Sequence, residues 1–234
     1  FSSGAIGWMI SEEPFMKYLR EHKIVDMMKL RASYGEIGDD NVGDRFLYMT
    51  QWAYGGKTQL GTTASDKESI YTWYRESSVG NPNVHWEKVK KVNFGLDYGF
   101  LGGLITGAVD FFHDTRTDIL VLGNSRSMPS YFGQTAPAAN LGKVTTSGYE
   151  LEVKFNKVFA NKMRLWANFN MTHAVNEVKI KDDAALLPSY RKAAGHAINQ
   201  TYTFLDKGIL QNYDDVYGSP KMDSNDGQRL PGDY

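Results

Sequence analysis

The chain has 234 residues, enough for one large domain or two modest ones. Its 26 Lys and Arg residues against 27 Asp and Glu residues give a net charge of −1, so no overall field points to nucleic acid or to an acidic membrane surface. Cysteine is absent, which excludes disulfides and thiolate metal sites, and no apolar run approaches the ~20 residues of a transmembrane helix, so membrane insertion would require strands.

The N-terminal residues predict a strand followed by a helix. In residues 1–10 an apolar side chain stands at every second position from Ile6, as in a strand. Residues 11–14 then carry a hydroxyl N-cap, two acids and an early proline, the pattern of a helix start. Apolar residues at helical spacing extend this short helix to about Glu21 or Lys23.

Two further strands are expected on either side of a loop. Residues 28–35 alternate between apolar and polar side chains, and residues 35–43 have the composition of a loop. Residues 45–54 are an aromatic-rich strand candidate, and the long polar segment 55–85 follows. Loops of this length are uncommon in compact soluble domains, whereas outer-membrane barrels carry them on their extracellular side.

The clearest pattern of the chain lies at residues 92–100. Every even position there is apolar and every odd position is small or polar, so a strand would have one apolar and one polar face. The polar face contains Gly, Asn and Asp97, which suit a soluble strand poorly. Transmembrane barrel strands combine an outward apolar face with a polar, wet interior. At roughly 3.3 Å per residue and a tilt of about 45°, this strand covers most of an apolar band ~25 Å tall.

Three later segments repeat the two-faced pattern. Residues 104–118 alternate after the Gly102-Gly103 turn, and residues 149–155 and 163–171 alternate as well. The polar faces of the last two carry Glu, Lys, Arg and Asn together, and such charges are tolerated only in water or in pairs. We therefore expect these faces to line a wet interior.

Short and long connections alternate along the chain. Residues 101–103 and 159–162 make tight connections, while residues 123–142 and 179–194 make long ones. An up-and-down barrel of the outer membrane has this asymmetry, with short turns at one end and long loops at the other.

The C-terminal part is less regular. A helical turn is expected within residues 182–192, and a weaker eighth strand at residues 198–204. Residues 211–234 are predicted to be polar loop without a closing aromatic strand, which argues against a closed eight-strand barrel.

No constellation of catalytic or metal-binding residues stands out. The five histidines lack metal-ligand spacing. Glu150 and Glu152 could be a glycosidase pair, but they are same-face neighbours on one strand, and charge lining a lumen is the favoured interpretation. Residues 223–227 resemble half a calcium loop without its spacing, so a polar turn is favoured. We expect no enzyme, no catalytic residues, no metal and no cofactor.

Six short motifs occur in the same order as in one protein family. They lie at residues 1–15 (FSS, then W, then SEEPF), 29–38 (KLRASYG, then G), 81–97 (NPNVHWE, then NFGLD), 117–120 (TDIL), 140–150 (NLG, then GYE) and 231–233 (PGD). Ser2, Asp39 and Thr146 depart from the family pattern, which has Pro, Asn and Asn at these places. Together the motifs resemble those of the SusC/RagA-like TonB-dependent outer-membrane transporters of Bacteroidetes-type bacteria, over nearly all of the chain.

The resemblance implies the fold. Residues 1–234 would be part of one TonB-dependent receptor β-barrel domain, with the plug domain not in this chain. The expected fold is all-β, an antiparallel up-and-down transmembrane β-barrel that is present in part, as about eight strands of a larger barrel, with short helices in loops. Because the chain opens on Phe1 without a signal peptide, we expect it to be an internal piece of a longer protein.

The resemblance also implies a function. The full protein would import oligosaccharides or peptides across the bacterial outer membrane together with a SusD-like surface lipoprotein. TonB would act through segments outside this chain, the barrel would contact outer-membrane lipid, and no nucleic acid would be involved. The sequence leaves open whether the substrate is a glycan or a peptide. Four aromatic residues are candidate ligand contacts, although an aromatic girdle or loop packing explains them equally well: Trp52, Tyr54, Tyr131 and Phe132.

A soluble β-sandwich that binds glycans is the alternative. Alternation alone favours it, because soluble strands are commoner than membrane strands. The loop asymmetry and the ordered motifs favour the transporter. The two hypotheses differ in the surroundings of Phe94, Tyr149 and Phe169, which a sandwich would bury against a second layer and a transmembrane barrel would turn toward lipid.

Overall fold

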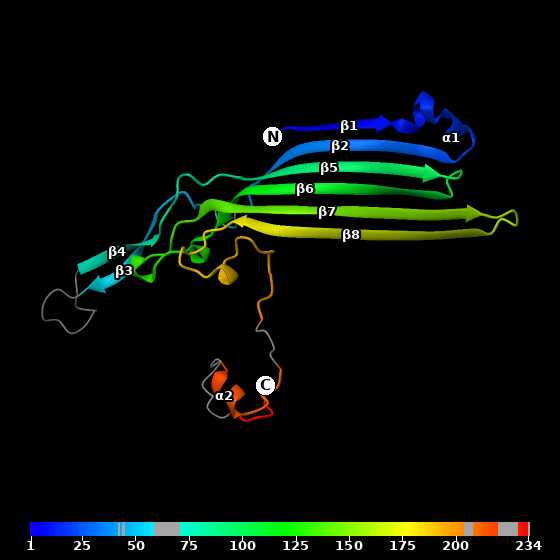
Figure 1. Cartoon of the computed structure of the whole chain (residues 1–234). Helices are drawn as coiled ribbons and strands as arrows, with labels where there is room; N and C mark the ends of the chain where they lie inside the picture. The colour runs from blue at the N-terminus through cyan, green and yellow to red at the C-terminus, as the bar shows by residue number, and fades with distance from the viewer. Residues whose placement is uncertain (42, 44, 59–70, 204–207, 220–228, 234) are drawn as a thin grey trace. The chain divides into compact units, whose positions relative to one another are not determined.

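One open antiparallel sheet dominates the computed structural model, which describes residues 1–41, 43, 45–58, 71–203, 208–219 and 229–233. The chain divides into two compact units, residues 1–198 and residues 199–234. Six strands of the first unit form the sheet, in the order β1-β2-β5-β6-β7-β8 (Figure 1). Their bounds are Ser3–Met9 for β1, Val25–Asp39 for β2, Glu87–Phe100 for β5, Ile105–Val121 for β6, Ala139–Val158 for β7 and Arg164–Ile180 for β8.

The other two strands form a separate hairpin. β3 (Gln51–Thr58) pairs with β4 (Tyr71–Ser78), and the two are not hydrogen-bonded to the large sheet. The prediction of an all-β, antiparallel, unclosed part of a barrel is therefore confirmed. The described residues form eight strands, of which six lie in the sheet.

Short helical segments lie in the connections, as predicted. Three of them join β1 to β2: η1 (Ile10–Glu12), η2 (Pro14–Met16) and α1 (Lys17–Glu21). The remaining ones are η3 (Gly123–Ser125), η4 (Ser130–Phe132), η5 (Ser189–Arg191) and, in the second unit, α2 (Tyr213–Gly218). No helix in the part of the chain that is described has the length and apolar character needed to cross a membrane.

Several element boundaries in the N-terminal half differ from those expected. Ser11 is buried within η1 rather than capping a helix, and the α-helix begins only at Lys17. Residues 35–39 continue β2 instead of forming a loop, because their backbone pairs with the start of β5. The strand predicted at residues 45–54 begins at Gln51 and belongs to the hairpin.

Further differences concern segments that were predicted from their polar composition. The polar segment predicted as loop at residues 55–85 contains β4, whose Tyr74 lies opposite Tyr54 of β3, while residues 59–70 lie outside the described part. Residues 198–203 form no strand, whereas α2 interrupts the polar C-terminal segment. The calcium-like residues 223–227 lie outside the described residues. Composition alone did not show which polar segments find a pairing partner.

The strand register gathers the apolar side chains on one face. Phe94 of β5 pairs with Phe111 of β6, which pairs with Tyr149 of β7, and directly opposed residues of antiparallel strands share a face. We call this surface the apolar face: the even-numbered residues of β1, β2 and β5 and the odd-numbered residues of β6 (as far as Arg116), β7 and β8. The opposite surface is the polar face.

No second layer of described residues covers the apolar face. Phe94 and Phe169 are 59% and 56% exposed, and Tyr149 is half-buried between its strand neighbours. A sandwich or a small closed barrel would bury these side chains. An open sheet with large exposed aromatics on one face instead requires an apolar environment outside the chain.

Tyr98 fastens three strands on the apolar face. Its ring lies over Gly107 of β6, and its hydroxyl donates a hydrogen bond to the backbone oxygen of Glu152 in β7 at 3.0 Å. A Cβ at Gly107 would lie 2.0 Å from that oxygen and 2.6 Å from the Tyr98 hydroxyl. Glycine is therefore required here by close approach, and the aromatic ring covers the gap that it leaves.

The two ends of the sheet differ as predicted, except that the longer connection between β1 and β2, residues 10–24, lies at the end of the tight turns. At one end, the short-turn end, residues 101–104 and 159–163 join β5 to β6 and β7 to β8. Leu101, Gly102 and Gly103 have positive φ values of 57°, 67° and 79°, a conformation that glycine adopts without strain. At the other end, the long-loop end, the connections run between β2 and β5, between β6 and β7, and onward from β8 (Figure 1).

Candidate functional site

The polar face carries charged and amide side chains along most of its length. Cross-strand rows bring together residues that are far apart in sequence: Lys29, Arg31, Asp97, Asp110, Glu150, Glu152, Lys154, Asn168 and Asn170. Glu150 and Glu152 do not form an isolated carboxylate pair, because Lys154 contacts Glu152 with an Nζ–Oε1 distance of 2.7 Å. Among the described residues, no group of three or more His, Asp or Glu could hold a metal ion. The face has the make-up of a wet interior wall.

Arg31 is the centre of the strongest charge cluster on this face. Its Nε and Nη2 donate to the two carboxylate oxygens of Asp97 at 2.9 and 2.8 Å, and Nη2 also donates to Asp110 at 3.0 Å. These bonds connect β2, β5 and β6. Bidentate pairing of this kind has the short distances of charge-assisted hydrogen bonds.

Gly95 makes room for this cluster. It pairs with Arg31 and Asp110 in the two neighbouring strands. A Cβ at Gly95 would lie 2.6 Å from the Asp110 carboxylate and 2.7 Å from the Arg31 guanidinium carbon. Gly95 thus leaves a space that the long charged side chains of the adjacent strands fill.

A hollow of about 600 Å³ lies on the polar face toward the long-loop end. Its walls combine aliphatic side chains with two cations and two anions. Its side-chain lining is Ile37, Asp39, Val89, Lys91, Asp114, Arg116, Ile119, Val144, Thr146 and Ile198. Small-ligand sites have volumes of ~300–1,000 Å³. The volume of this hollow lies within that range, so the hollow is a candidate binding site.

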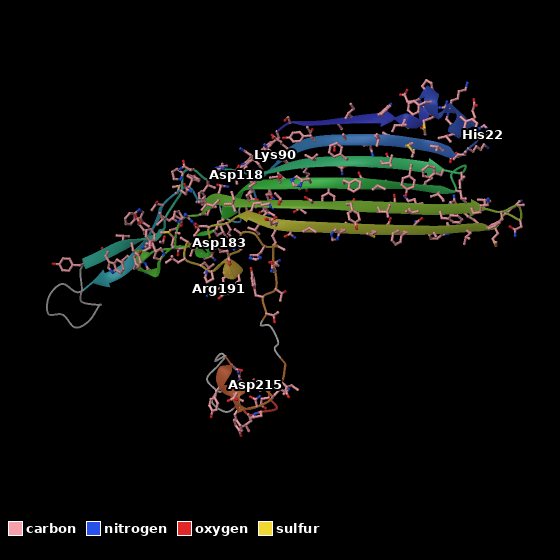
Figure 2. All side chains as sticks on the ribbon, viewed as in Figure 1. His22, Lys90, Asp118, Asp183, Arg191 and Asp215 are labelled. Atoms are coloured by element: carbon pink, nitrogen blue, oxygen red, sulfur yellow. The ribbon has the colours of Figure 1, made fainter. Side chains whose placement is uncertain are left out.

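A bulge in β6 shapes one wall of the hollow. The register shifts between Arg116 and Ile119, and Asp118 takes a positive φ of 58°. Because the extra residue reverses the alternation, Ile119 turns toward the hollow together with Arg116. Asp118 and Lys90 are labelled at this end of the sheet in Figure 2.

Asn140 holds the long-loop end together. Its side-chain oxygen accepts from the His85 backbone N–H at 3.0 Å, and its Nδ2 donates to the backbone oxygens of His85 and Asp118 at 2.8 and 2.7 Å. Asn81 and Glu87 add bonds of the same type, to the Ala138 oxygen at 2.9 Å and from the Leu120 N–H at 3.0 Å. Residues from three separate sequence motifs therefore form one hydrogen-bonded rim.

We expect Asn140→Ala to loosen this rim without unfolding the sheet. The substitution leaves two backbone carbonyls and one backbone N–H without their partner. We expect a free-energy cost of ~1–3 kcal/mol in total. Hydrogen exchange followed by mass spectrometry on the full-length protein should therefore quicken about tenfold at residues 81–87 and 117–121. Residues 149–155 should keep their exchange rates. Asn156→Ala, which removes an amide at the other end of the sheet, should leave the rim unchanged, and equal exchange in both variants contradicts this role for Asn140.

The four aromatic residues predicted as ligand contacts lie in two of the long connections. Trp52 and Tyr54 lie on the β3–β4 hairpin, where Tyr54 contacts Tyr74 edge-on with ring centroids 6.0 Å apart. Tyr131 and Phe132 lie in η4, in the connection between β6 and β7. All four are exposed. None of them is among the described residues that line the hollow, and none of the lining residues was a predicted ligand contact. One signal in the sequence was available: Ile37 and Val89 are apolar residues at odd positions, which belong to the polar face in β2 and β5.

Comparison with known proteins identifies the sheet. The model of the TonB-dependent receptor-like β-barrel family matches residues 17–232. The chain belongs to the TonB-dependent receptor β-barrel family. This confirms the resemblance drawn from the six motifs, and it explains why the sheet is open: the described strands are part of a barrel.

Two curated TonB-dependent receptors show the extent of the match. The TonB-dependent receptor SusC of Bacteroides thetaiotaomicron is 30% identical over 179 residues, which are 76% of this chain and 17% of SusC. The TonB-dependent receptor P39 of Formosa agariphila is 26% identical over an alignment of 235 positions, which covers 98% of this chain and 20% of that protein. The chain thus spans about a fifth of the length of these relatives.

Solved structures agree on the fold. The RagAB peptide importer in its closed-closed state superimposes with a TM-score of 0.64 at 22% identity, over 83% of this chain and 20% of that chain. Another structure of the RagAB peptide transporter gives 0.61 at 22% identity, over 76% of this chain and 18% of that chain. The chain therefore shares its fold with part of these two structures.

Proposed function

We propose that this chain forms part of the barrel wall of a TonB-dependent nutrient importer in the bacterial outer membrane. One observation carries the proposal: a sheet with an uncovered apolar face and a charged opposite face, in a member of the TonB-dependent receptor family. The apolar face contacts lipid, and the polar face lines the passage through which the substrate moves. Residues 1–234 belong to this barrel domain, and the plug domain is a separate part of the full protein.

The limits of the apolar face support a membrane boundary at the long-loop end. Beyond Val92 the same face becomes polar, with Lys90 of β5 beside Glu36 of β2, Nζ–Oε1 3.6 Å. Tyr34 stands at this boundary and donates its hydroxyl to Glu36 at 2.8 Å. Tyrosine at the edge of an apolar band, next to charged groups, is typical of the aromatic girdle of outer-membrane barrels.

The importer takes up oligosaccharides or peptides too large for open pores, together with a SusD-like lipoprotein at the long-loop end. The relatives named SusC and RagAB support this partnership. TonB acts through parts of the full protein outside these strands. The exposed aromatics Trp52, Tyr54, Tyr131 and Phe132 remain candidate contacts for substrate or lipoprotein. The protein acts as a transporter and not as an enzyme.

Spin labels on the full-length protein in lipid vesicles test the direction of the two faces. Labels at Phe94 and Leu151 should be accessible to oxygen and protected from a water-soluble nickel reagent, since they face acyl chains. Labels at Asn93 and Glu150, their polar-face neighbours, should show the opposite. Protection of the Phe94 and Leu151 labels from both reagents would mean a second protein layer and would end the proposal.

Transport itself is tested in the native bacterium. Deletion of the gene should abolish uptake of the fluorescently labelled oligosaccharide or peptide that the wild type takes up. A protonophore, which removes the energy that TonB transmits, should abolish it equally. The lipoprotein should copurify with the tagged full-length protein. Uptake that persists unchanged after deletion contradicts the proposed function.

A further inference from the structure

At the long-loop end of the sheet the polar face becomes mostly aliphatic and the apolar face becomes polar. On the polar face, one cross-strand row is mostly aliphatic: Ile37, Val89, Arg116, Val144 and Val178. On the apolar face at the same height, the side chains are polar: Lys90, Thr115, Thr145 and Glu177. Aliphatic side chains therefore gather inside the passage, above the apolar band, where water would otherwise surround them.

The hollow lies on this aliphatic row. Val89 is 7% exposed and forms its floor, with Val144 and Ile119 beside it. Ile198 closes one side, because its backbone N–H donates to Asn176 Oδ1 at 2.7 Å and so anchors the segment after β8 to the polar face. The result is an apolar recess of about 600 Å³ in an otherwise charged wall.

The charges around the recess are of both signs and only loosely paired. Lys91 and Asp114 are 3.5 Å apart, and Arg116 lies 3.7 Å from both Asp39 and Glu87. These separations are longer than the ~2.7–2.9 Å of charge-assisted hydrogen bonds, so the groups retain capacity to bind a ligand. The two cations and two anions of the lining balance, and a polyanionic ligand would find no net attraction here.

We propose that the hollow is a subsite for a peptide segment with an aliphatic side chain, and this rests on the proposed import function. The aliphatic side chain fills the recess over Val89. Arg116 and Lys91 hold a carboxylate of the peptide, while Asp39 and Asp114 accept from its N–H or ammonium groups. An oligosaccharide fits this subsite poorly, because sugar rings bind best against aromatic faces and the described residues of the lining have aliphatic, charged or hydroxyl side chains.

Binding to the purified full-length protein tests the subsite. The probes are a pentapeptide with a free carboxylate and a central leucine, the same peptide with serine in place of leucine, and a neutral heptasaccharide. By calorimetry, the leucine peptide should bind at least about tenfold more tightly than the serine peptide, because it buries more apolar surface. The substitution Arg116→Gln should weaken binding of the leucine peptide at least about tenfold. Arg164→Gln, a matched substitution at the short-turn end, should leave binding unchanged.

Each outcome decides the inference. Equal affinity for the leucine and serine peptides, or undiminished binding to Arg116→Gln, overturns it. Lys91→Gln serves as the second charge variant if Arg116→Gln does not fold. Binding of the heptasaccharide without the peptide overturns the peptide subsite but leaves the import function standing, whereas loss of the import function would appear separately, as uptake unaffected by gene deletion.

Discussion

Met171→Arg should lower the free energy of unfolding by about 2–4 kcal/mol, the range for an arginine near the bilayer midplane of an outer-membrane barrel. Met171 lies on the apolar face, in one row with Leu96, Val109 and Leu151, near the middle of the apolar band. It is exposed, so arginine meets no steric obstacle and its cost reflects only the surroundings of the face. Denaturant unfolding of the full-length protein in lipid vesicles measures the change.

Asn170→Arg is the matched control for this prediction. Asn170 is also exposed and is adjacent on β8, but it lies on the polar face opposite Glu152. An arginine there stays in water and can pair with that carboxylate, so we expect a change within about 0.5 kcal/mol. Equal effects of the two substitutions would show that the faces do not meet different solvents.

Arg31→Met should destabilise the sheet by about 1–3 kcal/mol. The guanidinium is the shared partner of Asp97 and Asp110, and its removal leaves two carboxylates close together without a cation. The three side chains are 35%, 25% and 18% exposed, so water screens part of the effect and the cost stays below that of a fully buried pair. Denaturant unfolding at low and high salt should show a larger loss at low salt.

A rescue experiment separates charge from packing at this cluster. Adding Asp97→Asn and Asp110→Asn to Arg31→Met removes the unpaired charges, and it should restore more than half of the lost stability. A triple variant no more stable than Arg31→Met would show that Arg31 acts through the packing of its aliphatic part.

Local sequence pattern predicted most of the strands of the large sheet. Alternation at residues 92–100 predicted the two faces of β5, and the Gly102-Gly103 turn predicted the tight connection to β6. The same pattern failed at residues 35–39, where glycine and acidic residues indicated a loop. Those residues are strand because β5 supplies their hydrogen-bond partners along the whole edge. Pairing between strands overrides weak local preference.

In the candidate site too, the sequence pointed to single residues and the structure showed which of them interact. Asn81, Glu87 and Asn140 stood out as motif residues, but their common role at the rim became visible only from their hydrogen bonds. The aromatic residues chosen as ligand contacts were selected for their type, and the structure places them on the hairpin and in η4. Residue type indicates which side chains could contact a ligand, whereas the tertiary structure decides which side chains share one surface.

The sequence by itself determined the class of fold, the two-faced strands and the order of short and long connections, since these depend on neighbours along the chain. Only the tertiary structure decided that Arg31 meets Asp97 and Asp110, 66 and 79 positions away, and that Ile37, Val89 and Val144 share one recess. The physical reason is that a period of two residues assigns each side chain to a face, but the register between strands selects its neighbours on that face.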